Sequence, residues 1–289
     1  MLLFTMATQL TPLPEVARLS PRCIRILGGN PGKFSLQGTN TYLLGTGAQR
    51  LLIDTGEGKP SWIAAVKKTL DEEKATIESA IITHWHHDHQ GGISQLKGLW
   101  PQVNVYKNQP EPGQLDIADG QKFEVEGASL TAVYSPGHTV DHMSFVLQEE
   151  NAMFTGDNVL GHGTAVFEDL TTYLESLEKM KQLFRGRAYP GHGPALVDGP
   201  AKVAEYIRHR RQREEQVLKA LRSENSGVGP QDFASWTAME LVKVIYRDVP
   251  ETLHHAAAGG VIQILKKLQA EGKALVDNDR WRLSDRSAL

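Results

Sequence analysis

Residues 83–92 read THWHHDHQGG, and this stretch decides how the rest of the sequence is interpreted. It places four histidines and one aspartate within the six positions 84–89. Such a segment cannot be an ordinary packed core, because each buried imidazole or carboxylate would need a hydrogen-bonding partner of its own. A shared metal ion satisfies all of them together, so the sequence predicts a metal site here.

The spacing within this stretch favours two neighbouring metal positions. His84 and His86 lie two residues apart at the end of an extended apolar run, so both side chains can point the same way. Asp88 and His89 follow as the chain turns, and the next two glycines allow the backbone to bend sharply. We expect one metal at His84 and His86, and another at Asp88 and His89.

Three later segments each place one further candidate ligand just after a strand and beside a glycine. They are SPGHT at 135–139, TGDN at 155–158 and YPGHG at 189–193, which supply His138, Asp157 and His192. Loops at one edge of a sheet can converge on one point, so distant segments can complete a single site. Each segment alone is typical of an ordinary turn, but the four together in this order predict a metal centre.

The motifs HWHHDH, SPGHT, TGDN and PGHG resemble the signature of the metallo-β-lactamase superfamily of hydrolases, and the resemblance runs from about Arg22 to Pro194. The resemblance implies an α/β fold, the four-layer αβ/βα sandwich, with a binuclear metal site at one edge of its sheets. It implies that His84, His86 and His138 hold the first metal. For the second metal it implies the set Asp88, His89 and His192, with Asp157 bridging the two.

Two divalent metals about 3.5–4 Å apart lower the pKa of a bound water and polarise the substrate oxygen, so we expect hydrolysis by metal-hydroxide attack. Nitrogen and oxygen ligands of this mixture suit two zinc ions best, although manganese or iron could use the same atoms. Asp88 can orient the water and take up or return its proton, so it is the candidate catalytic acid/base.

Five other histidines are weighed separately. His87 occupies the position that the motif leaves free and is expected to face solvent. His142 has two possible roles. It either donates a hydrogen bond to a metal ligand or to the substrate, or it is a surface or turn residue whose hydrogen bonds are satisfied locally. Two positions are open for His162, one at the lining of the cleft and one outside it. His254 and His255 are expected to be structural.

The chain divides into two parts by its pattern of apolar residues and turns. Residues 1–222 are expected to form the hydrolase domain, with alternating strands and helices and a long charged helix at 202–222. Residues 223–232 (SENSGVGPQD) are the linker candidate. Helices at 237–247 and 251–270 followed by a hairpin at 274–283 predict a small winged-helix-like domain within 223–289. We expect this tail to serve packing, dimerisation or substrate docking, which leaves a homo-oligomer open.

Composition limits the remaining function classes. The chain has 289 residues, a net charge of −3, and one cysteine, which excludes an internal disulfide and a cysteine-based zinc site. No apolar run is long enough for a membrane span, and we expect no membrane partner. The first residues do not form a secretory signal, so a cytoplasmic location is expected, with a mitochondrial one as the alternative.

The longer sequence around the motifs resembles one branch of the superfamily across nearly the whole chain. That branch contains fungal thioesterases that release a polyketide chain of the atrochrysone-carboxyl type from an acyl carrier protein. It also contains a mitochondrial endoribonuclease that cuts single-stranded RNA. The resemblance therefore implies either an acyl-carrier-protein thioester or RNA as the partner and substrate.

The residues favour the thioesterase, in polyketide or secondary metabolism. A thiol leaves without obligatory protonation, so an activated water and a polarised carbonyl suffice. RNA cleavage would require a basic groove with stacking aromatic residues, but aromatic residues are only 7% and the basic run 208–213 contains none. Those arginines could equally meet an acidic carrier protein or a phosphopantetheine phosphate. A binding module, in which a metal-free or metal-structural domain serves as a scaffold, is disfavoured, because the ligand set is complete at a strand edge and structural zinc sites are usually closed by four ligands.

Overall fold

Two β-sheets packed face to face form the centre of the computed structural model, which describes residues 10–223 and 235–284. The predicted linker, except for its first residue, lies outside the described residues. The first sheet has six strands in chain order, of which the first four pair antiparallel and the last three pair parallel. These strands are β1 (Val16–Ser20), β2 (Cys23–Leu27), β3 (Asn40–Leu44), β4 (Gln49–Ile53), β5 (Thr76–Ile82) and β6 (Asn104–Lys107).

The second sheet has five strands in the order β11-β10-β9-β8-β7. It is antiparallel except for the parallel pair β10 and β11. Its strands are β7 (Lys122–Val125), β8 (Ala128–Tyr134), β9 (Met143–Leu147), β10 (Ala152–Gly156) and β11 (Ala188–Pro190). A one-turn 3-10 helix, η1 (Gln148–Glu150), joins β9 to β10.

Alternate side chains of a strand enter different cores, which explains why the central strands are apolar throughout. In β4, Leu51 and Ile53 point into the core between the sheets, whereas Leu52 points to the core under the outer helices. In β2, Cys23 belongs to the inner core and Ile24 to the outer one. Because both faces are covered, apolar residues are favoured at every position of these strands.

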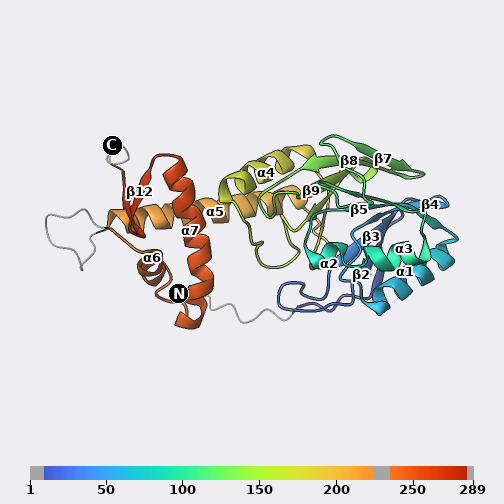
Figure 1. The fold of residues 1–289 in the computed structure, drawn as a ribbon, viewed down its shortest axis with the longest axis horizontal. Coiled ribbons are helices and arrows are strands. Elements are labelled where there is room, and N and C mark those ends of the chain that lie inside the picture. The colour runs from blue at the N-terminus through green and yellow to red at the C-terminus, as the bar shows by residue number, and fades with distance from the viewer. Residues whose placement is uncertain (1–9, 224–234, 285–289) are drawn as a thin grey trace.

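Helices cover the outer face of each sheet and complete four layers (Figure 1). The helices α1 (Pro60–Glu73) and α3 (Ile93–Leu99) pack on the first sheet, and α4 (Leu170–Leu183) and α5 (Gly199–Arg222) pack on the second. Asp169 and Asp198 accept hydrogen bonds from backbone N–H groups at the starts of α4 and α5, which satisfies donors that a helix leaves unpaired. The predicted αβ/βα sandwich is confirmed.

The C-terminal residues form a winged-helix domain, as predicted. It contains α6 (Ala238–Ile245), η2 (Glu251–Leu253), α7 (His254–Ala270) and a hairpin of β12 (Ala274–Asp277) and β13 (Arg280–Leu283). Figure 1 shows α5 as the long helix that leads from the sandwich to this domain. Leu177 of α4 and Leu265 of α7 share one apolar core, so the domain packs directly on the outer helices.

Several elements differ from the sequence-based expectations, among them α5, which begins at Gly199 rather than at residue 202. The edge strand β1 was not expected, because none of its five residues VARLS is buried and two of them are polar. Helix α1 begins at Pro60, two residues before Trp62, where the apolar pattern of residues 62–70 predicts its start. Proline is favoured in the first helical turn because it lacks an N–H group. None of the described helices is long and apolar enough to cross a membrane.

Candidate metal centre

The seven predicted ligand residues lie together where strands of both sheets end. His84 and His86 follow β5, Asp88 and His89 lie in the short helix α2 (His87–Gln90), and the other three follow strands of the second sheet. The metal-binding atoms form two groups, and within each group all of them lie within 4.8 Å of one another. The first group is His84, His86, His138 and Asp157, and the second is Asp88, His89 and His192.

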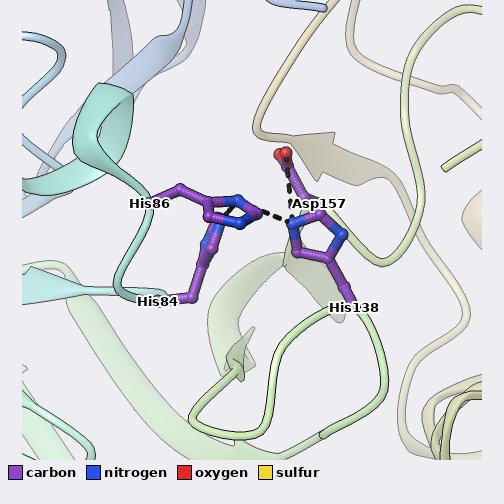
Figure 2. Close-up of side chains that lie close together, drawn as sticks. All are labelled: His84, His86, His138 and Asp157. Atoms are coloured by element: carbon purple, nitrogen blue, oxygen red, sulfur yellow. Dashed lines mark hydrogen bonds and ion pairs between the residues drawn. The ribbon is translucent and has the colours of Figure 1, made fainter. Parts of the chain in front are cut away.

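The first group presents three imidazole nitrogens and one carboxylate to a common point (Figure 2). Nδ1 of His86 lies 3.0 Å from Nε2 of His84 and 3.1 Å from Nε2 of His138. Two nitrogens bound to one tetrahedral zinc ion are separated by about 3.4 Å, given a zinc–nitrogen distance of about 2.0–2.1 Å. The three nitrogens therefore have a spacing close to the one that a single cation requires.

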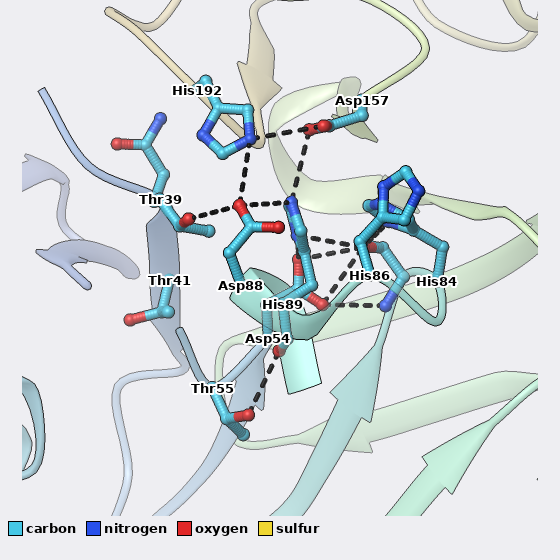
Figure 3. A network of polar contacts seen from close by, with 12 residues as sticks. Thr39, Thr41, Asp54, Thr55, His84, His86, Asp88, His89, Asp157 and His192 are labelled. Carbon is cyan, nitrogen blue, oxygen red and sulfur yellow. Dashed lines mark hydrogen bonds and ion pairs between the residues drawn. The ribbon is translucent and has the colours of Figure 1, made fainter. Parts of the chain in front are cut away.

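The second group has two imidazoles and one carboxylate (Figure 3). The carboxylate oxygen Oδ2 of Asp88 lies 3.3 Å from Nε2 of His192 and 3.5 Å from Nε2 of His89. All three atoms thus face the same small volume, as ligands of a second cation would.

Asp157 lies between the two groups. Its Oδ2 is 3.7 Å from Nε2 of His138 in the first group and 3.2 Å from Nε2 of His192 in the second. Its Oδ1 and Nε2 of His89 are 3.5 Å apart, yet both are buried without a hydrogen-bond partner among the described residues. Buried polar atoms rarely lack a partner, so a cation between these residues fits the observed arrangement.

Gly191 of the PGHG motif makes this close approach possible. A Cβ atom at this position would lie 2.2 Å from Oδ1 of Asp157 and 2.9 Å from Cε1 of His89. Its carbonyl also accepts a hydrogen bond from the N–H of Asn40, and the Asn40 side chain donates to the carbonyls of Pro190 and Gly193. Strand β3 thereby fixes the loop that carries His192.

Asp54, at the end of β4, holds ligands of both groups through one carboxylate. It accepts hydrogen bonds from Nδ1 of His89 at 2.7 Å and from the Thr83 hydroxyl at 2.9 Å. The Thr83 hydroxyl in turn lies 2.9 Å from Nδ1 of His84. With their Nδ1 atoms occupied in this way, His84 and His89 both present Nε2 to the centre. Sequence reasoning missed Asp54, and its position directly after a buried strand was the only available signal.

Thr39 holds the candidate acid/base residue. Its hydroxyl donates to Oδ2 of Asp88 at 2.8 Å, and it is itself fixed by two hydrogen bonds with the side chain of Asn30. Sequence reasoning missed both residues, because neither belongs to a recognised motif and the contact spans 49 positions.

His142 is fully buried behind Asp157 rather than placed at the surface. Its Nε2 accepts a hydrogen bond from the backbone N–H of Asp157 at 3.2 Å, and its Nδ1 lies 3.0 Å from the Ser135 hydroxyl. Burial lowers the pKa of His142 well below its usual value, and nearby histidines add to this effect. A neutral imidazole therefore supports the turn that carries Asp157, and it does so as an acceptor rather than as the donor that was considered from the sequence.

The charges of the centre compensate one another. Burial alone would lower the pKa of His89, but the carboxylates of Asp157 and Asp54 outweigh it and raise that pKa well above its usual value. Burial would raise the pKa of Asp157, but His192 and His89 lower it well below the usual range. The pKa of His84 is lowered, mainly by burial. These shifts leave carboxylates ionised at neutral pH, as ligands must be.

The remaining histidines fall into clear positions. His87 is exposed, as expected, and His162 lines the cavity at the centre. His254 is buried, and its Nε2 lies 3.0 Å from the carbonyl oxygen of Val249, whereas His255 is exposed.

An open cavity of about 590 Å³ leads from the surface to both groups of side chains. It reaches His86, Asp88, His138, Asp157 and His192 at its floor. Its walls come from two loops, one around residues 30–36 and the other around 160–166. Substrate and water can therefore reach the candidate ligands, which distinguishes this centre from a closed structural site.

Comparison with known families decides the classification of this centre. The sequence model described as "Metallo-beta-lactamase superfamily" matches residues 35–111 and 102–192, which contain all seven candidate ligands. The chain belongs to the metallo-beta-lactamase superfamily. It is an enzyme, a metal-dependent hydrolase. A second model, "Beta-lactamase associated winged helix domain", matches residues 237–281.

The superfamily includes relatives that are similar along nearly the whole chain. A protein of Aspergillus chevalieri named "Atrochrysone carboxyl ACP thioesterase" is 48% identical, over 92% of this chain and 87% of the relative. "Lactamase-like protein adaB" of Aspergillus niger is also 48% identical, over 93% of this chain and 88% of the relative.

Solved structures of the superfamily share the fold. A beta-lactamase domain protein from Burkholderia ambifaria has a TM-score of 0.77 at 17% identity, over 93% of each chain. A metallo-beta-lactamase family protein from Thermus thermophilus has a TM-score of 0.72 at 22% identity, over 92% of this chain and all of the other. At this level of identity the likeness concerns the fold alone.

Proposed function

We propose that this protein is a binuclear-zinc thioesterase that releases a polyketide acyl chain from an acyl carrier protein. The observation that carries the proposal is the seven-residue centre open to a cavity, in a chain that is 48% identical to a relative named as an acyl-carrier-protein thioesterase. That similarity covers 92% of this chain, including the winged-helix domain.

In this proposal the two groups of side chains hold one metal each. His84, His86 and His138 hold the first, Asp88, His89 and His192 hold the second, and Asp157 is shared. The donor set of imidazole nitrogens and carboxylate oxygens suits zinc, and manganese or iron is a weaker alternative. The buried atoms His89 Nε2 and Asp157 Oδ1, for which residues 10–223 and 235–284 provide no hydrogen-bond partner, support this assignment.

The two cations, when bound, would lower the pKa of water and polarise the thioester carbonyl. Asp88 is the residue of this chain that accepts and returns the proton, since it reaches the cavity floor and is only partly buried. Thr39 donates to its Oδ2, which fixes the carboxylate and leaves Oδ1 as the atom for proton transfer.

The cavity has walls suited to an apolar acyl group beside a polar floor. Its apolar lining residues include Phe34, Leu36, Leu160 and Val166. Phe34 and Val166 are strongly exposed, at 74% and 62%, so their apolar surface is available to a ligand. Burial of a polyketide chain against these side chains would leave its carbonyl near Asp88 and the metal ligands.

The test uses the full chain loaded with zinc and two substrates in parallel. One is an aromatic acyl thioester of an acyl carrier protein, and the other is labelled single-stranded RNA. Thioester turnover that is lost in Asp88→Asn, without RNA cleavage, is the expected result. RNA cleavage that depends on Asp88, with no thioester turnover, would replace the proposed function by the endoribonuclease alternative.

A further inference from the structure

A second cavity, of about 480 Å³, lies beside the metal centre at the junction of the hydrolase and winged-helix domains. Its wall is formed by the segment 164–167, Leu170 at the start of α4, helix α5, and residues between 246 and 264 of the winged-helix domain. Gly259 and Gly260 of α7 lie at this wall, and a Cβ atom on either would meet nothing within 4 Å. The absence of side chains there keeps the cavity open to a ligand.

The cavity is basic. His209, Arg210 and Arg213 line it, and none of its lining residues is acidic. These three residues occupy adjacent positions on one face of α5, because residues three and four apart on a helix are neighbours. A cavity with this charge favours an anionic ligand.

Arg210 forms a fixed part of the wall. One of its terminal nitrogens donates to the carbonyl of Ala165 at 2.5 Å, and its guanidinium carbon lies 4.6 Å from the ring centroid of Phe167. Its Nε is buried without a hydrogen-bond partner among the described residues, and so is Nδ1 of His209. Arg210 therefore contributes a positive charge held in place at the cavity wall.

Arg213 is positioned from the other side of the cavity. Its Nη1 donates to the side chain of Gln216 at 2.8 Å, and its guanidinium carbon lies 4.8 Å from the ring centroid of Tyr246. The ring and Gln216 orient the guanidinium while its other nitrogens have no partner among the described residues. A guanidinium held in this way suits a planar, bidentate contact with phosphate oxygens.

The second cavity and the metal cavity share a wall. Thr164, Ala165 and Val166 line both of them. The carbonyl of Val166 accepts a hydrogen bond from Nδ1 of His138, at 2.8 Å, so this strip is attached directly to a candidate metal ligand. A ligand that starts at Arg213 can therefore cross Val166 and end at the metal centre.

We propose that the second cavity binds the phosphate of the 4′-phosphopantetheine arm of an acyl carrier protein, while the arm crosses Val166 and its thioester enters the metal cavity. The proposal rests on the proposed thioesterase function. It explains how a substrate carried on a flexible arm is held at two points, and why the winged-helix domain contributes a wall of the substrate path.

The aromatic residues of the cavity argue against RNA as the occupant. Binding of single-stranded RNA uses exposed aromatic faces on which successive bases stack. Here Phe167 is covered by Arg210 and stacked on Tyr173, and Tyr246 is covered by Arg213. The cavity thus provides one cluster of cationic donors, which suits a single phosphate group. The lining residues that the structure describes do not provide the series of phosphate contacts and exposed aromatic faces that single-stranded RNA requires.

The test measures binding and does not depend on turnover. The first probe is the S-ethyl thioether of 4′-phosphopantetheine, and the second is the S-ethyl thioether of pantetheine, which lacks the phosphate. Each is titrated calorimetrically into the zinc-loaded full chain. Arg213→Gln should weaken binding of the phosphorylated probe about tenfold, the loss expected for a charge-assisted hydrogen bond, and leave the other probe unaffected. Arg208→Gln, an exposed residue of the same helix outside the cavity, should change neither affinity.

A second pair of variants leaves the arginines in place. Gly260→Asp would bring a carboxylate to the open cavity wall and should weaken binding of the phosphorylated probe, whereas Gly260→Asn has the same shape without the charge and should not. Equal wild-type affinity for the two probes, including no binding of either, would overturn the proposal. So would Arg213-dependent binding of a short RNA without binding of the phosphorylated probe. Probe binding as expected, without hydrolysis of any thioester, would contradict the proposed function and support this site.

Discussion

The carboxylate of Asp54 accepts a hydrogen bond from Nδ1 of His89 at 2.7 Å, although the two residues are 35 positions apart. Asp54 has a φ of +59°, a left-handed conformation that aspartate and asparagine tolerate better than most residues. The same carboxylate accepts from the Thr83 backbone and hydroxyl, and so reaches His84 indirectly. One residue that is not a candidate ligand therefore orients members of both groups.

Asp54→Asn is predicted to weaken metal binding at the second group about 10–100-fold, the usual effect of removing a partner behind a metal-binding histidine. Asparagine keeps the backbone conformation but loses an acceptor oxygen. Calorimetric titration with zinc checks this, and the exposed Asp71→Asn serves as the control. Unchanged zinc affinity in Asp54→Asn would show that His89 does not need this partner.

Asp88→Asn is predicted to reduce thioester hydrolysis about 10²–10⁴-fold, because the candidate proton acceptor is lost. The fold should persist, since Asp88 is partly exposed at the cavity floor. Steady-state rates measure the loss of thioester hydrolysis, and thermal unfolding of the same preparation checks that the fold persists. Full activity in this variant would remove Asp88 from the mechanism.

His142→Ala is predicted to lower the free energy of unfolding by about 2–4 kcal/mol. The change leaves a buried cavity and removes the acceptor of the Asp157 N–H group and the partner of the Ser135 hydroxyl. Denaturant unfolding of the metal-free protein measures the loss. His87→Ala, at an exposed position, should change the stability by less than about 0.5 kcal/mol. Equal stabilities of the two variants would contradict the supporting role of His142.

Lys267 of α7 joins the winged-helix domain to α5. It is predicted to make the free energy of unfolding vary with pH in the alkaline range. Its Nζ lies 2.9 Å from Glu214 and 2.6 Å from Glu271. Burial acts to lower the pKa of Lys267, but hydrogen bonds to Glu271 and Glu214 outweigh it and raise the pKa. The stabilising contribution is therefore complete below the unfolded-state pKa of about 10.4 and is lost as the pH rises through the folded-state value.

Lys267→Met should accordingly cost about 1 kcal/mol at pH 8 and less above pH ~11. Unfolding of both proteins at the two pH values measures this difference. A cost that is the same at both values would mean that the lysine acts through packing of its apolar stem rather than its charge.

The clustering of the candidate ligand residues could be anticipated from sequence because they occur in short motifs whose spacing reflects local geometry. Asp54, Thr39 and Asn30 could not, because each acts through a contact with a residue far along the chain or outside any motif. The sandwich was implied by the resemblance of the histidine- and aspartate-containing motifs to the superfamily, whereas β1, at the sheet edge, carries too few buried apolar residues to be recognised. The second cavity depends on the tertiary packing of α5, α7 and the segment 164–167 around it, which no local pattern encodes.

Anomalous X-ray scattering at the zinc edge, from crystals of the zinc-loaded full chain, locates the bound cations. A binuclear centre should give two peaks on either side of Asp157, one among His84, His86 and His138 and the other among Asp88, His89 and His192. A single peak, or peaks that avoid these side chains, would contradict it.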